Sequence, residues 1–239
     1  MKLYTYGRLL GKIAEYATSV SLNTPYNGMY KHSFEPVYQL ANRFSQNSHF
    51  VGEFKGCLHA GEHCPLTGLY HPPYDFIHPE NEEHGLSVKS ILRNNASKIS
   101  PSCIGQPNIS KFCNVFNINN QDEYYIKYHI ENRVGEMLDA YWKHTFQYPI
   151  LFYHAKRDDV VLIKPKEQIP WFDLKYKFTH QLKNKLWKES TTLYVDDGKS
   201  YSKTIGEFQF HNHRNCIKFR FSLLNILHEF PQCFTIKQW

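Results

Sequence analysis

The chain has 239 residues, of which 41% are hydrophobic and 16% aromatic, so it can form a packed core and is not expected to be disordered. It has neither a signal-peptide pattern at its N-terminus nor the roughly 20 consecutive apolar residues of a membrane helix, so we expect a soluble, cytoplasmic protein that makes no membrane contact. Six cysteines are too few for a disulfide scaffold, and the formal charge of +6 favours polyanionic partners such as nucleic acids.

Two helices are predicted in an N-terminal helical part that covers about residues 1–50. Apolar residues recur at helical spacing between Leu9 and Val20. The second helix is expected from Glu35 to Phe44, with Ser33 as its cap and Pro36 in its first turn.

A strand hairpin is predicted over about residues 72–93. Its strands are Tyr74 to His78 and Leu86 to Leu92, and the turn-rich segment 79–85 separates them.

The remaining elements suggest an α/β protein. In chain order they are a helix from Glu123 to about Phe146, strands at Tyr148 to His154 and Asp159 to Ile163, a helix from Phe172 to Trp187, and strands at Ile205 to His211 and Asn215 to Phe221. No repeat or linker divides the chain, so we predict a single domain over residues 1–239, with a mixed central β-sheet flanked by helices.

Asp75, Ser87 and Lys89 are the candidate catalytic residues of the hairpin. Ser87 and Lys89 are two positions apart and face the same way in an extended strand, and closure of the hairpin would bring Asp75 beside both. A carboxylate next to a lysine suits metal-assisted hydrolysis of a phosphodiester. The carboxylate can hold Mg²⁺ through oxygen, while the lysine can place or deprotonate the attacking water.

These residues resemble the active site of the PD-(D/E)xK nucleases, and among them of type II restriction endonucleases. The matching segments are Pro73-Tyr74-Asp75 and Ser87-Val88-Lys89, but Ser87 occupies a position where most of the family has an acid. Some restriction enzymes with Ser-x-Lys take the missing carboxylate from about a dozen residues downstream, and the segment 101–104 contains no acid. The resemblance therefore implies a second metal ligand from elsewhere. Glu35 on the early helix is our choice, and Glu53 or another acid of the chain is the alternative.

The segment from Ile205 to Phe221 belongs to a β-rich part covering about residues 192–222. It alternates apolar and polar residues, so it predicts a ribbon with one polar face. Gln, Asn, Arg and Lys side chains can recognise base edges in a DNA groove. The predicted DNA contacts are Gln209, His211, His213, Arg214, Lys218 and Arg220. The segment also resembles one near the C-terminus of some restriction enzymes, although an ordinary half-exposed hairpin shows the same alternation.

Two alternative sites remain open. Asp197, Glu207 and Gln209 also fit a variant of the nuclease motif in which Gln replaces Lys. Cys57, His59, His63 and Cys64 could bind zinc, although four ligands within eight residues are cramped for a single tetrahedral site.

The combined prediction is a Mg²⁺-dependent, sequence-specific endonuclease that cuts double-stranded DNA, with a restriction-endonuclease-like core. The resemblance implies a homodimer, because palindromic DNA sites match two-fold symmetry, and a cognate methyltransferase in the same system. The alternatives are a non-catalytic DNA-binding protein and a nuclease of DNA repair or of a toxin.

Overall fold

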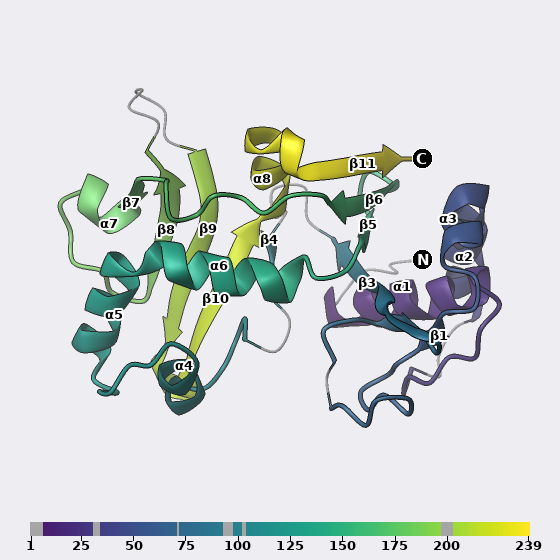
Figure 1. Ribbon diagram of the computed structural model, residues 1–239, viewed down its shortest axis with the longest axis horizontal. Helices are drawn as coiled ribbons and strands as arrows, with labels where there is room; N and C mark the ends of the chain where they lie inside the picture. Colours follow the sequence, from purple (N-terminus) through teal and green to yellow (C-terminus); the bar gives the residue numbers. More distant parts are fainter. Residues whose placement is uncertain (1–6, 31–33, 71, 93–97, 102–103, 197–202) are drawn as a thin grey trace. The chain divides into compact units, whose positions relative to one another are not determined.

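The computed structural model describes residues 7–30, 34–70, 72–92, 98–101, 104–196 and 203–239, which form two compact units (Figure 1). The first contains Met1–Ala96, Phe146–Lys166 and Phe234–Trp239, and the second contains Ser97–Thr145 and Glu167–Cys233. The α/β class is confirmed, but the strands form two sheets, one in each unit, instead of the single central sheet that was predicted. The single domain over residues 1–239 stays a prediction. Its catalytic hairpin lies in the first unit and its C-terminal β-rich part in the second.

The first unit contains a six-stranded mixed sheet in the order β1-β2-β3-β5-β6-β11. β3 and β5 are parallel, whereas the other neighbouring strands are antiparallel. The strands are β1 (Leu58–His59), β2 (Phe76–His78), β3 (Asn81–Ile91), β5 (Ile150–His154), β6 (Asp159–Pro165) and β11 (Phe234–Gln238).

The predicted hairpin is present, but its turn is shorter than the sequence indicated. β3 already begins at Asn81, which pairs with His78, so most of the segment 79–85 is strand. The register shifts between Ile77 and His78, and this irregularity takes up the extra residues of β3.

Three helices belong to the first unit: α1 (Gly7–Ser21), α2 (Phe34–Ser45) and α3 (Ser48–Glu53). The two predicted N-terminal helices are confirmed as α1 and α2. Leu10, Ile13 and Ala17 of α1 are buried in one core cluster with Leu86 and Val88 of β3. This packing holds α1 near the strand that carries Ser87 and Lys89.

The second unit contains a five-stranded sheet in the order β4-β10-β9-β8-β7, in which all neighbouring strands are antiparallel. The strands are β4 (Lys98–Ile99), β7 (Tyr176–Phe178), β8 (Ser190–Val195), β9 (Lys203–His211) and β10 (Cys216–Ser222). The predicted C-terminal ribbon is confirmed as β9 and β10, which are joined by the short 3-10 helix Asn212–Arg214.

Helix α6 covers the apolar face of this sheet, and it crosses β8, β9 and β10 in Figure 1. The ring of Tyr141 stacks on that of Phe219 with centroids 4.3 Å apart, and both residues are fully buried. Trp171 is also buried, and its ring packs against Trp142 and Phe221. The helices of this unit are α4 (Ile109–Val115), α5 (Glu123–Asn132), α6 (Val134–Thr145), α7 (Thr179–Leu182) and α8 (Leu223–Glu229).

Two helix predictions need correction. The long helix expected from Glu123 to Phe146 is divided into α5 and α6 at Arg133, whose φ of −125° leaves the helical region. The helix expected from Phe172 to Trp187 is wrong. Its middle forms β7, which pairs with β8, and the left-handed φ of 50° at Asn184 lies just beyond the end of α7.

Within the described residues, no helix is long and apolar enough to cross a membrane.

Candidate active site and polar sheet face

The backbone of Asp75 is fixed from two sides at the start of β2. Its N–H donates to the carbonyl of Leu86 at 2.9 Å, and its carbonyl accepts from the N–H of Ala60 at 2.9 Å. Asp75 therefore has a set position between β3 and the end of β1.

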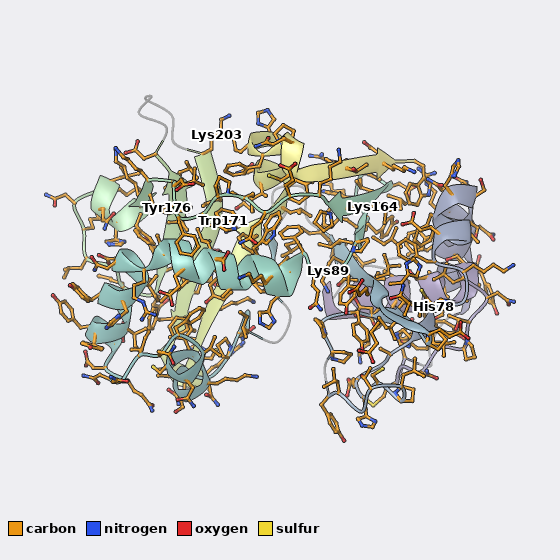
Figure 2. The ribbon with its side chains drawn as sticks, viewed as in Figure 1. His78, Lys89, Lys164, Trp171, Tyr176 and Lys203 are labelled. Carbon is orange, nitrogen blue, oxygen red and sulfur yellow. The ribbon has the colours of Figure 1, made fainter. Side chains whose placement is uncertain are left out.

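The side chain of Asp75 contacts three consecutive residues of β3. Its Oδ2 atom accepts hydrogen bonds from Ser87 Oγ at 3.1 Å and from the N–H of Val88 at 2.5 Å. The Nζ atom of Lys89, which Figure 2 labels, lies 3.6 Å from the same oxygen. The structure thus brings together Asp75, Ser87 and Lys89, as the hairpin geometry predicted.

Ser87 is much less exposed to solvent than the side chains of Asp75 and Lys89. Ser87 is buried, with 2% of its surface exposed. The side chains of Asp75 and Lys89 are 23% and 26% exposed. Both the carboxylate of Asp75 and the ammonium group of Lys89 are therefore accessible to solvent, while the buried Ser87 donates a hydrogen bond to the carboxylate.

Glu15 of α1 is a second acid that interacts with this group, and it was not predicted from the sequence. Burial raises the pKa of Glu15 above its usual range. The negative charge of Asp75 raises it further, while His59 and Lys89 act in the opposite direction. Glu15 thus lies near enough for its charge to interact with both Asp75 and Lys89. Its position beside the buried stripe of an early helix was the one available signal in the sequence.

His59, at the end of β1, lies against Glu15. Its Nε2 atom is 3.8 Å from Glu15 Oε2, and its side chain is only 1% exposed. Its Nδ1 atom accepts a hydrogen bond from the backbone N–H of Asn27 at 3.0 Å. In the neutral ring the proton is therefore on Nε2, the nitrogen that faces the carboxylate.

The acids that were expected to complete the site have other surroundings. Glu35 is exposed in the first turn of α2, and its Oε1 accepts a hydrogen bond from Gln39 at 3.2 Å. Glu53 forms an ion pair with Lys164 of β6. The role of Glu35 stays a prediction, and these contacts give it no support.

The donor set fits a magnesium ion better than a metal held by protein ligands alone. Among the residues that the structure describes, no three His, Cys, Asp or Glu side chains form a metal-binding group. Mg²⁺ needs only one or two carboxylates, because waters and substrate phosphates complete its octahedral shell. Asp75 and Glu15 supply two partly exposed carboxylates whose mutual repulsion a cation would relieve.

The residues considered for zinc are Cys57, His59, His63 and Cys64. Cys64 is buried and accepts a hydrogen bond from the hydroxyl of Tyr74 at 3.7 Å, while His63 is exposed and packs on the ring of Tyr70. Because His59 faces Glu15, the described structure directs these side chains toward different partners.

The sheet of the second unit has a polar face formed by β9 and β10. Lys218 pairs in register with Gln209, and Arg220 with Glu207, while the intervening Phe219 is buried on the opposite face. We call Gln209, His211, Arg214, Lys218 and Arg220 the polar sheet face; His213 is exposed beside Arg214 in the connecting 3-10 helix.

Positive charges are crowded on the polar sheet face. Burial lowers the pKa of Lys218, and the charges of Arg220 and Arg214 lower it further. The pKa of His211 is lowered by burial and then by the positive charges nearby, which are those of Arg214, Lys218, His213 and Arg220. In addition, the buried Nε of Arg220 has no hydrogen-bond partner in the described structure. A bound anion would relieve this repulsion.

The alternative nuclease motif is only partly described. Asp197 lies outside the described residues. Glu207 Oε2 contacts Lys98 Nζ at 2.6 Å and an Arg220 guanidinium nitrogen at 2.8 Å. Burial acts to raise the pKa of Glu207, but these two cations outweigh burial and lower it. Glu207 is thus already neutralised by two partners.

The comparison with known proteins agrees with the resemblance read from the sequence. The chain is homologous to the type II restriction enzyme CviAII of Paramecium bursaria Chlorella virus 1, with 33% identity over 231 residues. The match covers 95% of this chain but 61% of that enzyme, so the chain spans about three-fifths of its relative's length. No protein-family profile and no solved structure matches the chain. The resemblance to type II restriction enzymes is confirmed, and membership of the PD-(D/E)xK superfamily stays a prediction.

Proposed function

We propose that this chain, a homologue of a type II restriction enzyme, is a sequence-specific endonuclease that hydrolyses double-stranded DNA with Mg²⁺. The observation that carries the proposal is the convergence of Ser87, Val88 and Lys89 on one carboxylate oxygen of Asp75. The charge of Glu15 next to this group adds a second acid.

Asp75 and Glu15 would hold the magnesium ion, with Glu15 in place of Glu35. Bound there, Mg²⁺ would offset the charge that develops on the scissile phosphate. Ser87 takes no acidic role in this proposal. It donates to Asp75 Oδ2 and fixes which oxygen of that carboxylate stays directed toward β3.

Lys89 would act on the attacking water. Its ammonium group is 3.6 Å from Asp75 Oδ2 and partly exposed, so it can approach both a water and a phosphate oxygen. There it would orient the water and stabilise the negative charge of the pentacovalent transition state.

DNA would be bound by the polar sheet face, through Gln209, His211, Arg214, Lys218 and Arg220, with His213 beside them. Cations that repel one another in the free protein gain most from a phosphate backbone. Gln209 and Lys218, paired across the strands, present side chains of the types that read adenine and guanine edges.

We further propose that the mixed sheet of the first unit is a restriction-endonuclease-like core, that two chains form a homodimer on palindromic DNA, and that a cognate methyltransferase protects the host DNA. These three proposals follow from the homology to a type II restriction enzyme. Light scattering on the purified chain with and without DNA measures whether the homodimer forms.

The experiment is plasmid cleavage with and without Mg²⁺ by the wild type, Lys89→Ala and Lys164→Ala. Lys164 is a matched control, because it lies on the same sheet, is also ion-paired and is 29% exposed, compared with 26% for Lys89. We expect discrete Mg²⁺-dependent bands from the wild type and the control, and their loss in Lys89→Ala.

Each other result selects an alternative. Salt-sensitive DNA binding without cleavage would support a non-catalytic DNA-binding protein. Smeared rather than discrete products would indicate a nuclease of repair or of a toxin. Bands that survive in Lys89→Ala would move the chemistry to Asp197, Glu207 and Gln209.

A further inference from the structure

His59 is a buried polar side chain of the first unit, and its ring has two aromatic contacts and a hydrogen bond. It lies between the rings of Tyr26, at 4.7 Å, and Phe76, at 5.0 Å. Tyr26 in turn stacks on Tyr16 at 4.4 Å, and Tyr16 is the neighbour of Glu15 along α1. A histidine held in this way cannot turn its ring without disturbing two aromatic contacts.

Asn27 fixes the orientation of the same residue through two hydrogen bonds. Its backbone N–H donates to Nδ1 of His59 at 3.0 Å, and its side-chain amide donates to the carbonyl of His59 at 2.7 Å. The first bond directs the Nε2 proton toward Glu15, 3.8 Å away. The second ties the end of β1 to the segment that follows α1.

His59 is also linked to Asp75 through the backbone. It pairs in register with Phe76, and the next residue, Ala60, donates its N–H to the carbonyl of Asp75 at 2.9 Å. The residue that faces Glu15 is therefore built into the same stretch of sheet that fixes Asp75.

We infer that His59 is a positioning residue of the active site, which keeps the carboxylate of Glu15 in place through the 3.8 Å contact between its Nε2 and Glu15 Oε2. The inference rests on the proposed function and deepens it, because it explains how an acid from a helix is held at a site built on strands. Partners that orient a ligand side chain in this way commonly change metal affinity or activity by about 10- to 100-fold when they are removed.

The test compares His59→Phe with His59→Gln in the full chain, by the cleavage rate as a function of Mg²⁺ concentration. Phenylalanine keeps the ring contacts but has no N–H, whereas glutamine can still donate to Glu15. We expect the Mg²⁺ concentration for half-maximal rate to rise by about 10-fold or more in His59→Phe and by less in His59→Gln. DNA affinity without divalent cations should be unchanged in both variants.

A matched control separates positioning from a loss of packing. His154 of β5 is also buried, with 3% of its surface exposed, and its Nδ1 accepts from the N–H of Arg157 at 3.3 Å. We expect His154→Phe to lower the melting temperature without moving the Mg²⁺ dependence. Equal Mg²⁺ dependence in His59→Phe and the wild type would overturn the inference.

A double-mutant cycle with Glu15→Gln tests the route of action. If His59 acts through Glu15, His59→Phe should change the rate of the Glu15→Gln variant by less than about 2-fold. If the rate losses of the two single variants multiply in the double variant, the inference is overturned while the proposed function stays intact. A wild type that binds DNA but never cuts it would instead overturn the proposed function. If His59→Phe fails to fold, the same cycle is run with His59→Leu, which also has no N–H, and the same multiplication of losses counts against the inference.

Discussion

The ammonium group of Lys89 lies 3.6 Å from Oδ2 of Asp75, although the two residues are 14 positions apart along the chain. The antiparallel pairing of Phe76 with Leu86 creates this contact, because it places the residue before β2 next to the middle of β3. Parallel pairing of Lys89 with Phe152 then fixes β3 against the rest of the sheet. The contact thus depends on the sheet rather than on a flexible loop.

Glu15→Gln should greatly reduce Mg²⁺-dependent cleavage, whereas Glu35→Gln should leave it nearly unchanged. Glu15 interacts with the charges of Asp75 and Lys89, while Glu35 is exposed and bonded to Gln39. Losing one of two metal-binding carboxylates should lower the rate at limiting Mg²⁺ by about 100-fold. Cleavage assays over a range of Mg²⁺ concentrations measure both variants. The reverse pattern would restore Glu35 as the ligand.

Ser87→Ala should keep cleavage activity at a reduced level. The hydroxyl of Ser87 donates to Asp75 Oδ2, but the N–H of Val88 donates to the same atom and remains in the variant. We expect a loss of about 1 kcal/mol in the free energy of unfolding, the usual net value of one hydrogen bond. Denaturant unfolding and the cleavage rate check the two parts. Complete loss of activity with unchanged stability would give Ser87 a direct role in the chemistry.

Glu207→Gln should strengthen DNA binding and leave cleavage intact. Glu207 neutralises Lys98 and Arg220, so its replacement frees two cations on the sheet of the second unit. The slope of log affinity against log salt should become steeper by up to about 1 for each extra phosphate contact. Binding titrations at several salt concentrations measure this slope. If cleavage disappears while binding persists, Glu207 belongs to the active site after all.

DNA binding should strengthen as the pH falls, because His211 gains a proton on binding. Burial and the nearby cations lower the pKa of His211 below its ordinary value of 6.5 in the free protein. DNA phosphates would reverse that repulsion and raise the pKa in the complex, so binding takes up a proton.

The lowered pKa of His211 gives stability the opposite pH dependence from DNA binding. The unfolded chain binds the His211 proton more readily than the native chain does, so stability increases as the pH rises from the lowered native pKa toward the ordinary value of 6.5, and it decreases as the pH falls through the same interval. Binding and unfolding of the wild type and His211→Asn between about pH 5 and 7.5 measure both effects, because the lowered pKa places the transition below the ordinary histidine value. The variant should show the weaker pH dependence in each case, and identical slopes would exclude His211 as their source.

The local patterns of the sequence determined several parts of this protein. Strict alternation from Ile205 to Phe221 predicted the β9–β10 ribbon and its polar face, because side chains of a strand point alternately to opposite sides. The spacing of Asp75, Ser87 and Lys89 predicted their meeting for the same reason, since a hairpin turns a short separation along the chain into a contact. Helical periodicity was likewise enough to predict α1, and a cap residue followed by Pro36 in the first turn predicted α2.

Tertiary structure decided what no local pattern contains. The segment from Phe172 to Trp187 is polar and lysine-rich, and pairing of Tyr176–Phe178 with β8 overrides the helix that its composition suggested. No sequence spacing links Glu15 to Asp75, because the two residues are 60 positions apart. Their interaction depends on the packing of α1 in one core with β3. The same holds for His59, whose role depends on contacts with Asn27 and Glu15. Contacts between distant parts of the chain are set by how buried faces pack, and this is why the position of Glu15 on an early helix was not enough to link it to Asp75.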